Sequence, residues 1–214
     1  MKTKPTQQAT QIYLEQRLPK GLEVGYKTKI VGKVEEDISL EGGKITKLIG
    51  RNGSGKSTLI TTICRLIKPL RGESTWGKTC YLPEELELPE EMTVEDILNS
   101  LTEKGGSSEE EILRWRTKLE LETGKKYKSL SKGNKQKVKI ALTEAKAAET
   151  EACLVCLDEP LSGLDKETGE IIKELWEEDK KKYPNRHRII SVHEREINFE
   201  QILEIKEGII KLHE

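Results

Sequence analysis

Long hydrophobic runs and aromatic residues are both scarce in this sequence. Of its 214 residues, 34% are hydrophobic and only 4% aromatic, with a single phenylalanine. No apolar stretch approaches the ~20 residues needed to cross a bilayer, and the N-terminus lacks the apolar segment of a signal peptide. We therefore expect a soluble chain that contacts a membrane only through a partner.

A surplus of one charge is also missing. Charged residues make up 35% of the chain, yet the two signs nearly cancel to a formal net charge of −1. No basic face is evident, so we predict no nucleic-acid partner. The runs Glu109–Glu111 and Lys180–Lys182 are interpreted as solvated helix faces.

Cysteines are few, and two of the four have the spacing of a metal site. Cys153 and Cys156 lie in a segment with the pattern of an apolar strand, where residues three apart point to opposite faces. Such a pair cannot share one metal ion. We expect buried, reduced thiols instead.

Short apolar strands alternate with amphipathic helices along most of the chain. This alternation predicts an α/β fold with a mostly parallel sheet covered on both faces. The last apolar stretch predicts a hairpin that turns at Glu207–Gly208. Strands are predicted at Ile12–Leu14, Ile30–Val34, Ile45–Ile49, Cys153–Asp158 and Arg188–Val192, and helices at Thr58–Ile67, Gly133–Ala148 and Lys166–Lys182.

The middle of the chain has helical patterns and no strand pattern. We predict one domain, with a helical subdomain of residues 86–127 inserted into a core of residues 1–85 and 128–214. Two pairs have the spacing of N-terminal caps, Thr93 with Asp96 and Ser108 with Glu111. A buried face is predicted from the spacing of Ile112, Trp115 and Leu119.

Residues 50–57 read GRNGSGKS and match the pattern GxxxxGK[ST] between a predicted strand and a predicted helix. Its glycines let backbone N–H groups turn toward phosphate oxygens, beside the positive end of the helix. Lys56 would contact the β- and γ-phosphates of ATP, and Ser57 would bind Mg²⁺. The predicted nucleotide-binding residues here are Gly50, Asn52, Gly53, Ser54, Gly55, Lys56, Ser57 and Thr58.

A second motif, LVCLDEP, places Asp158 and Glu159 where a buried strand ends. The carboxyl ends of parallel strands form the ligand-binding edge of an open α/β sheet. Asp158 would hold Mg²⁺ directly or through water, and Glu159 would act as the general base on the attacking water. The two motifs together predict hydrolysis of Mg-ATP.

Three further stretches carry a family resemblance. Residues 130–134 read LSKGN, which resembles the LSGGQ signature of ATP-binding-cassette (ABC) ATPases. Residues 162–165, SGLD, resemble the D-loop of that family, and residues 191–194, SVHE, resemble its switch-histidine segment. The motifs agree with the family in order and spacing from about Tyr26 to Gly208.

The resemblance implies a P-loop NTPase core with N-terminal antiparallel strands, and a nucleotide-dependent head-to-tail homodimer that encloses two ATP molecules. Ser131 and Gly133 begin a helix and would cap the γ-phosphate bound by the opposite chain. Asp165 would pass the state of the nucleotide across the interface. His193 would hydrogen-bond the γ-phosphate and, with Lys56 and Glu159, complete the catalytic set.

Two more site residues follow from the resemblance. Tyr26 stands where the family has an aromatic residue that stacks on adenine. Glu84, in YLPEE, replaces the glutamine of the family's Q-loop, which contacts the metal and nucleotide and links them to the transport partner. With LSKGN, this departure resembles ATPase subunits of drug- or sodium-extrusion exporters, which implies a cytoplasmic subunit on the inner face of the membrane, docked on an integral membrane permease.

Other functions fit these residues less well. A soluble ABC ATPase remains the alternative, for example in cofactor or cluster assembly. DNA-repair members need long coiled coils between the P-loop and the signature, and only about 75 residues separate the two motifs here. Translation members carry two cassettes with a basic linker, and this sequence shows neither feature. A small-molecule P-loop kinase would need an arginine-rich lid and neither LSKGN nor SGLD. A cassette that only binds ATP would lack catalytic groups, whereas Lys56, Asp158, Glu159 and His193 are all present.

Overall fold

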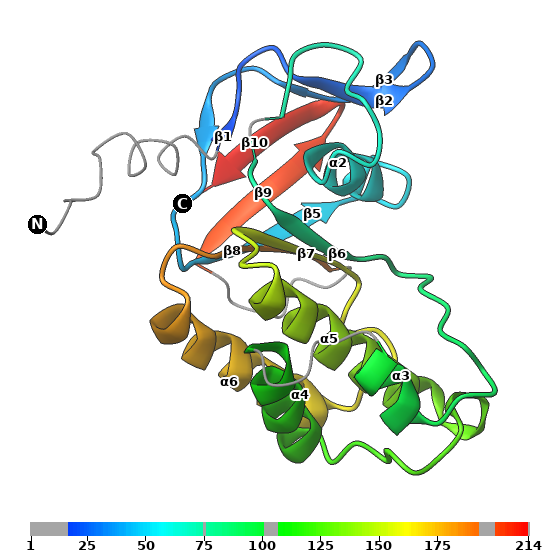
Figure 1. The fold of residues 1–214 in the computed structure, drawn as a ribbon. Coiled ribbons are helices and arrows are strands. Elements are labelled where there is room, and N and C mark those ends of the chain that lie inside the picture. Colours follow the sequence, from blue (N-terminus) through cyan, green and yellow to red (C-terminus); the bar gives the residue numbers. More distant parts are fainter. Residues whose placement is uncertain (1–16, 75, 101–106, 193–199, 214) are drawn as a thin grey trace, which may run out of the picture.

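A mixed β-sheet forms the centre of the computed structural model (Figure 1). The described residues are 17–74, 76–100, 107–192 and 200–213. Eight strands lie in the order β2 (Glu23–Tyr26), β3 (Lys29–Val34), β10 (Ile209–His213), β9 (Gln201–Lys206), β5 (Ile45–Gly50), β8 (His187–Ser191), β7 (Leu154–Asp158) and β6 (Thr79–Leu82). A separate short antiparallel pair is formed by β1 (Arg17–Leu18) and β4 (Ile38–Ser39).

Most neighbouring strands of the main sheet are parallel. β5 pairs in parallel with β8 and β9, and β7 does so with β8 and β6. The antiparallel neighbours are β2 with β3 and β9 with β10. The predicted α/β class, with a mostly parallel sheet and antiparallel N-terminal strands, is therefore confirmed.

Helices cover both faces of the sheet, as Figure 1 shows. Successive side chains of β7 enter different cores: Cys156 packs in the cluster that contains α2, whereas Val155 packs in the cluster that contains α5 and α6. Burial on both faces explains why β7 is apolar throughout until its last residue. The helices are α2 (Lys56–Ile63), α3 (Val94–Ser100), α4 (Ser107–Lys118), α5 (Lys132–Glu149) and α6 (Lys166–Lys182), with a 3₁₀ turn at Tyr127–Ser129.

The insertion between β6 and β7 carries α3 and α4. Val94 and Ile97 of α3 pack with Val138 of α5 in a third cluster. Trp115 of α4 and Leu119, which directly follows α4, are buried in the second cluster together with residues of α5 and α6. The predicted buried face of α4 is confirmed for these two residues.

Several predicted elements agree with the structure. The helix predicted at Lys166–Lys182 is α6, with the same bounds. The C-terminal hairpin is also confirmed, because β9 and β10 are antiparallel and join through Glu207 and Gly208, both with positive φ. The strand predicted at Ile12–Leu14 lies outside the described residues.

The helix after the glycine-rich loop is shorter than predicted. It ends at Ile63 rather than Ile67, and Arg65 has a left-handed φ of 60°. Its guanidinium group donates to the carbonyl of Trp76, which lies on the next part of the chain. Leu66, which lies beyond the end of the helix, is 63% exposed. A tertiary contact therefore ends a helix that the local pattern would have continued.

One of the two predicted caps is confirmed. Thr93 Oγ1 accepts a hydrogen bond from the backbone N–H of Asp96 at 3.1 Å and donates to its carboxylate at 2.6 Å. The Ser108–Glu111 cap was wrong, because α4 begins at Ser107 and Ser108 lies inside its first turn. Glu111 instead accepts hydrogen bonds from Trp115 and from residues of α6.

The expected geometry of Cys153 was also wrong. β7 begins at Leu154, so Cys153 precedes the strand. Its thiol donates to the carbonyl of Lys78 at 3.2 Å, and both Cys153 and Cys156 pack in the same hydrophobic cluster. Burial raises the pKa of each of these two thiols, which keeps them protonated.

Four of the described strands were not predicted: β1, β2, β4 and β6. β6 lies at the sheet edge beside β7, and its Leu82 is buried while Thr79 is half-buried. β2 pairs with β3 through a bulge at Val24–Gly25. Short or bulged strands give weak sequence patterns because pairing partners far along the chain supply most of their stability.

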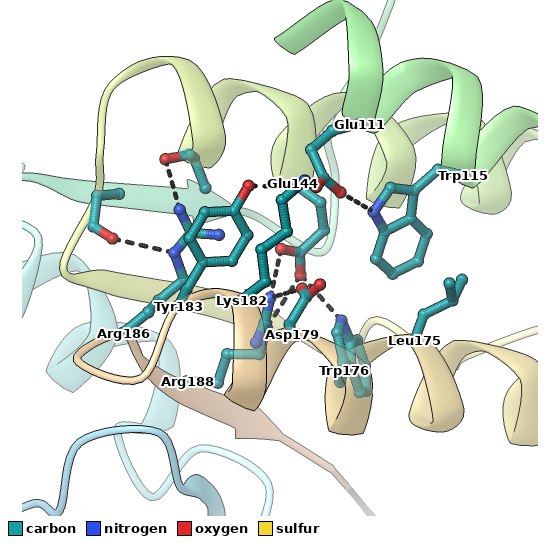
Figure 2. Close-up of polar contacts among 12 residues, drawn as sticks. Glu111, Trp115, Glu144, Leu175, Trp176, Asp179, Lys182, Tyr183, Arg186 and Arg188 are labelled. Carbon is teal, nitrogen blue, oxygen red and sulfur yellow. Dashed lines mark hydrogen bonds and ion pairs between the residues drawn. The ribbon is translucent and has the colours of Figure 1, made fainter. Parts of the chain in front are cut away.

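A buried group of charged residues joins three helices to the sheet (Figure 2). Arg188 of β8 donates to Glu144 of α5 at 2.6 Å and to Asp179 of α6 at 2.5 Å. Arg114 of α4 also reaches Asp179, at 2.5 Å. We call Arg114, Glu144, Asp179 and Arg188 the ion cluster; it joins α5, which begins within the predicted signature, to α6, which directly follows the predicted D-loop.

Candidate nucleotide-binding site

The glycine-rich loop leaves β5 at Gly50 and enters α2 at Lys56. Gly53 and Gly55 have φ values of 74° and 102°, which favour glycine. A Cβ on Gly55 would lie 2.6 Å from the Val31 side chain, whereas a Cβ on Gly53 would meet no atom within 4 Å. The loop backbone is therefore close to β3 on one side and open on the other.

The loop and the start of α2 fit a phosphate group. No side chain caps α2 at Gly55, so the N–H groups of its first turn remain available to a ligand. Lys56 is mostly buried, and its ammonium group donates to the carbonyl of Gly50 at 3.0 Å. The Ser54 hydroxyl is buried with no hydrogen-bond partner among the described residues. Donors and one cation thus converge here, as anion binding requires.

An open pocket of about 550 Å³ gathers most of the predicted site residues. Tyr26, at the end of β2, lines it with its side chain largely exposed. Lys29 and Val31, which were not predicted, also line this pocket. The predicted site residues that line it are Tyr26, Asn52, Gly53, Gly55, Lys56, Ser57, Thr58, Glu84, Asp158 and Glu159.

Asp158 and Glu159 enter the pocket from the carboxyl end of β7. Both side chains are mostly buried, and Glu159 has a left-handed φ of 50°. Mg²⁺ prefers oxygen ligands and is usually held by one or two carboxylates together with substrate phosphates. The carboxylate of Asp158 and the hydroxyl of Ser57 line the same pocket and are donors of that kind.

Ser191 is a residue at this site that the sequence prediction missed. It is fully buried at the end of β8, where it pairs in register with Asp158. Its hydroxyl donates to Asp158 Oδ1 at 2.5 Å and accepts from the backbone N–H of Glu159 at 3.0 Å. The available signal was a small polar residue directly after the apolar pair Ile189–Ile190, at the end of the strand.

Tyr81 also lies near the acidic pair, on β6. Burial raises the pKa of its phenol, and the negative charge of Asp158 raises it further. The phenol therefore stays protonated and can donate a hydrogen bond.

The predicted signature and D-loop of the same chain lie close together but outside the pocket. A Cβ on Gly133 would lie 3.2 Å from the carbonyl oxygen of Gly163. Gln136 of α5 donates to the carbonyl of Pro160 at 3.0 Å, which connects the signature helix to the segment after β7.

Ser131 and Asp165 are helix N-caps in this chain. Ser131 accepts from the N–H of Asn134 at 3.1 Å, and Asp165 accepts from the N–H of Thr168 at 2.8 Å. The hydrogen bonds from Thr168 lower the pKa of Asp165. His193 lies outside the described residues. Gly50 and Ser54 belong to the loop but do not line the pocket, and a Cβ on Gly50 would lie 2.5 Å from Ser54 Oγ.

The fold and the pocket together define a P-loop nucleotide-binding protein with an acidic pair at the end of the neighbouring strand. Residues 35–162, more than half of the chain, match the ABC transporter family. The chain therefore belongs to the ABC transporter family, whose ATP-binding domains are ATPases. Among the residues the structure describes, no helix is both long enough and apolar enough to cross a membrane.

Individual relatives agree with this assignment. An uncharacterized ABC transporter ATP-binding protein of Methanocaldococcus jannaschii is 36% identical, over 85% of this chain and 72% of the relative. A hemin import ATP-binding protein of Shewanella denitrificans is 31% identical, over 60% of this chain and 59% of the relative. A solved ATP-binding subunit of an ABC transporter has a TM-score of 0.75 and 27% identity, covering 90% of this chain and 86% of its own.

Proposed function

We propose that this chain binds and hydrolyses Mg-ATP as the energy-supplying subunit of an ABC transporter. The observation that carries the proposal is the single pocket that brings Tyr26, the glycine-rich loop, Asp158 and Glu159 together. An open N–H cradle, a cation and an acidic pair are the groups that Mg-nucleotide hydrolysis requires.

Each residue has a role that follows from its position. Tyr26 offers an aromatic face to adenine at the open side of the pocket, and the loop N–H groups with Lys56 bind the phosphates. Ser57 and Asp158 hold the metal, with Glu84 near it, and Glu159 accepts a proton from the attacking water. Bound Mg²⁺ would neutralise charge that develops on the phosphates. His193 completes the set as the γ-phosphate contact.

A second chain completes the site. Ser131, Gly133 and Asp165 lie outside their own chain's pocket but at the N-termini of α5 and α6. We infer a head-to-tail homodimer in which these termini cap the γ-phosphate bound by the partner, so that ATP holds the two chains together. We also propose that residues 86–127 form a helical lobe on the nucleotide-binding core. This lobe and the Glu84 loop contact an integral membrane permease at the inner face of the membrane.

Export is the proposed direction, on the resemblance of YLPEE and LSKGN to exporter subunits. Import is the second candidate, because a relative is named for hemin import. Substrate flux in inside-out vesicles that contain this chain and its permease separates them: ATP added outside drives accumulation for an exporter and depletion for an importer.

The first test of the proposal is nucleotide binding by purified protein. Wild-type protein should bind a fluorescent ATP analogue and release phosphate from ATP only with Mg²⁺. Lys56→Ala should lose binding, because it removes the charge that faces the phosphates. Lys173→Ala is the matched control, since Lys173 lies on α6 and pairs with Glu170. Unchanged binding by Lys56→Ala would refute the proposal.

A further inference from the structure

Ser191 connects the two carboxylate residues of the site by a pair of hydrogen bonds. It lies at the end of β8, is 0% exposed, and is in register with Asp158 on the neighbouring strand. Its Oγ is 2.5 Å from Asp158 Oδ1 and 3.0 Å from the backbone nitrogen of Glu159. Both contacts are buried, where a lost hydrogen bond is costly.

The direction of these hydrogen bonds follows from the chemistry of the groups. The backbone N–H of Glu159 can only donate, so it occupies a lone pair of the Ser191 oxygen. The single hydroxyl proton is then directed to Asp158 Oδ1, a charge-assisted bond to an ionised carboxylate. Ser191 thus bonds one oxygen of the Asp158 carboxylate and leaves the second without a bond from this hydroxyl, in a residue that lines the pocket.

The same bond restrains the backbone of Glu159. Its φ of 50° is uncommon for a residue with a side chain and persists only where neighbouring contacts hold it. Ser191 binds the N–H of Glu159 on one side, and the N–H of Ser162 donates to the Glu159 carbonyl at 3.1 Å on the other. The direction in which the Glu159 side chain leaves the backbone therefore depends on both bonds.

We propose that Ser191 is a positioning residue for the metal-dependent step: it orients Asp158 toward Mg²⁺ and Glu159 toward the attacking water. This inference rests on the proposed function. Groups that orient a metal ligand without contacting the metal are worth roughly 10–100-fold in metal affinity or activity. Ser191 is the last residue of β8 and lies two residues before His193, the predicted γ-phosphate contact, in the sequence.

The experiment compares Ser191→Thr with Ser191→Val. The two side chains have nearly the same shape, so their difference isolates the hydroxyl from the cost of the added methyl groups. Thr143→Ala is the control for loss of a buried hydroxyl, since Thr143 donates only within its own helix, to Lys139 at 2.9 Å. Electron paramagnetic resonance of Mn²⁺ measures metal binding to the ATP complex, and phosphate release gives kcat and KM.

Ser191→Val should bind Mn²⁺ in the ATP complex roughly 10–100-fold more weakly than Ser191→Thr and should lose kcat by a similar factor. The affinity for ATP without metal should be equal in the two variants, and Thr143→Ala should match wild type in both readouts. If wild-type protein binds Mg-ATP but the threonine and valine variants bind Mn²⁺ equally, Ser191 has no positioning role. If wild-type protein binds no Mg-ATP, the proposed function itself is refuted, and this inference with it.

Discussion

Arg188 of β8 and Asp179 of α6 form an ion pair in which the two side chains are only 3% and 1% exposed. Glu144 of α5 shares the same guanidinium group, with an equally buried carboxylate 2.6 Å from it. Glu144 is 44 residues from Arg188 in the sequence, and this contact joins α5, whose N-cap is Ser131, to β8 and to α6, whose N-cap is Asp165. The ion cluster therefore helps to fix the two helix N-termini that form the proposed dimer face.

Removal of Arg188 should be far more costly than removal of a surface arginine. Arg188→Met would leave two buried carboxylates with less compensation, and loss of one partner of a buried pair typically costs 3–5 kcal/mol. Arg116→Met is the matched control, because Arg116 and its partner Glu95 are both about two-fifths exposed, and such pairs contribute about 0–1 kcal/mol. Chemical denaturation measures both, and equal losses would contradict this account.

Glu159→Gln should keep ATP binding but lower turnover by ~10²–10⁴, the usual worth of a general base. The amide retains the shape of the carboxylate but cannot accept a proton from water. Steady-state phosphate release at saturating Mg-ATP is the measurement. Glu177→Gln, which alters only a surface pair with Lys180, should behave as wild type. Turnover of Glu159→Gln close to the wild-type rate would remove Glu159 from the mechanism.

ATP should drive dimerisation of Glu159→Gln, because unhydrolysed nucleotide holds both half-sites together. Adding Ser131→Arg should block the dimer by its bulk, at a cost of about 1 kcal/mol in stability for the lost N-cap. Ser131→Asp preserves a capping side chain but places a negative charge beside the γ-phosphate, so it should also prevent dimerisation.

Light scattering with and without ATP, beside a binding titration, checks the dimer prediction. Both Ser131 variants should bind ATP as monomers with nearly unchanged affinity. If Ser131→Arg lost monomer binding while dimers persisted, the signature would act on its own chain's nucleotide.

Stability should decline at mildly acidic pH because of His187. Burial lowers its pKa to about 4, against 6.5 for an exposed imidazole, and its ring contacts Trp76 edge-on at 5.2 Å. Above pH 6.5 the ring is neutral in both states and its full stabilisation is present. Between pH 6.5 and 4 the imidazole binds a proton in the unfolded chain but not in the folded chain. The free energy of unfolding therefore falls by about 3 kcal/mol over this interval.

His187→Phe should remove that part of the pH dependence and leave the packing with Trp76. His213→Phe is the control, since His213 is about half exposed. Urea denaturation from pH 7.5 to 4 measures the free energy of unfolding for each protein. Parallel pH profiles for wild type and His187→Phe would show that this histidine does not resist protonation.

Local patterns predicted the glycine-rich loop and the end of β7, two of the elements that build the pocket. The geometry of the loop at residues 50–57 depends on glycine conformations and on the strand and helix directly beside it in the sequence. One short segment therefore determines this geometry. The end of β7 was also predicted from the sequence, because a strand buried on both faces is apolar until Asp158. The bounds of α6 were also predicted, and the structure shows that Asp165 is its N-cap.

Tertiary structure decided what depends on distant partners. α2 ends early because Arg65 binds the carbonyl of Trp76, a contact that no local propensity contains. The site role of Ser191 follows from the register of β8 on β7, because a shift of one residue would turn its hydroxyl to the other face. The sequence by itself determined the phosphate loop, the acidic pair and the alternating α/β pattern, since their physical causes act over a few neighbouring residues. Only the packed sheet decided which buried polar groups meet, because the free energy of burying them depends on partners that the chain brings together when it folds.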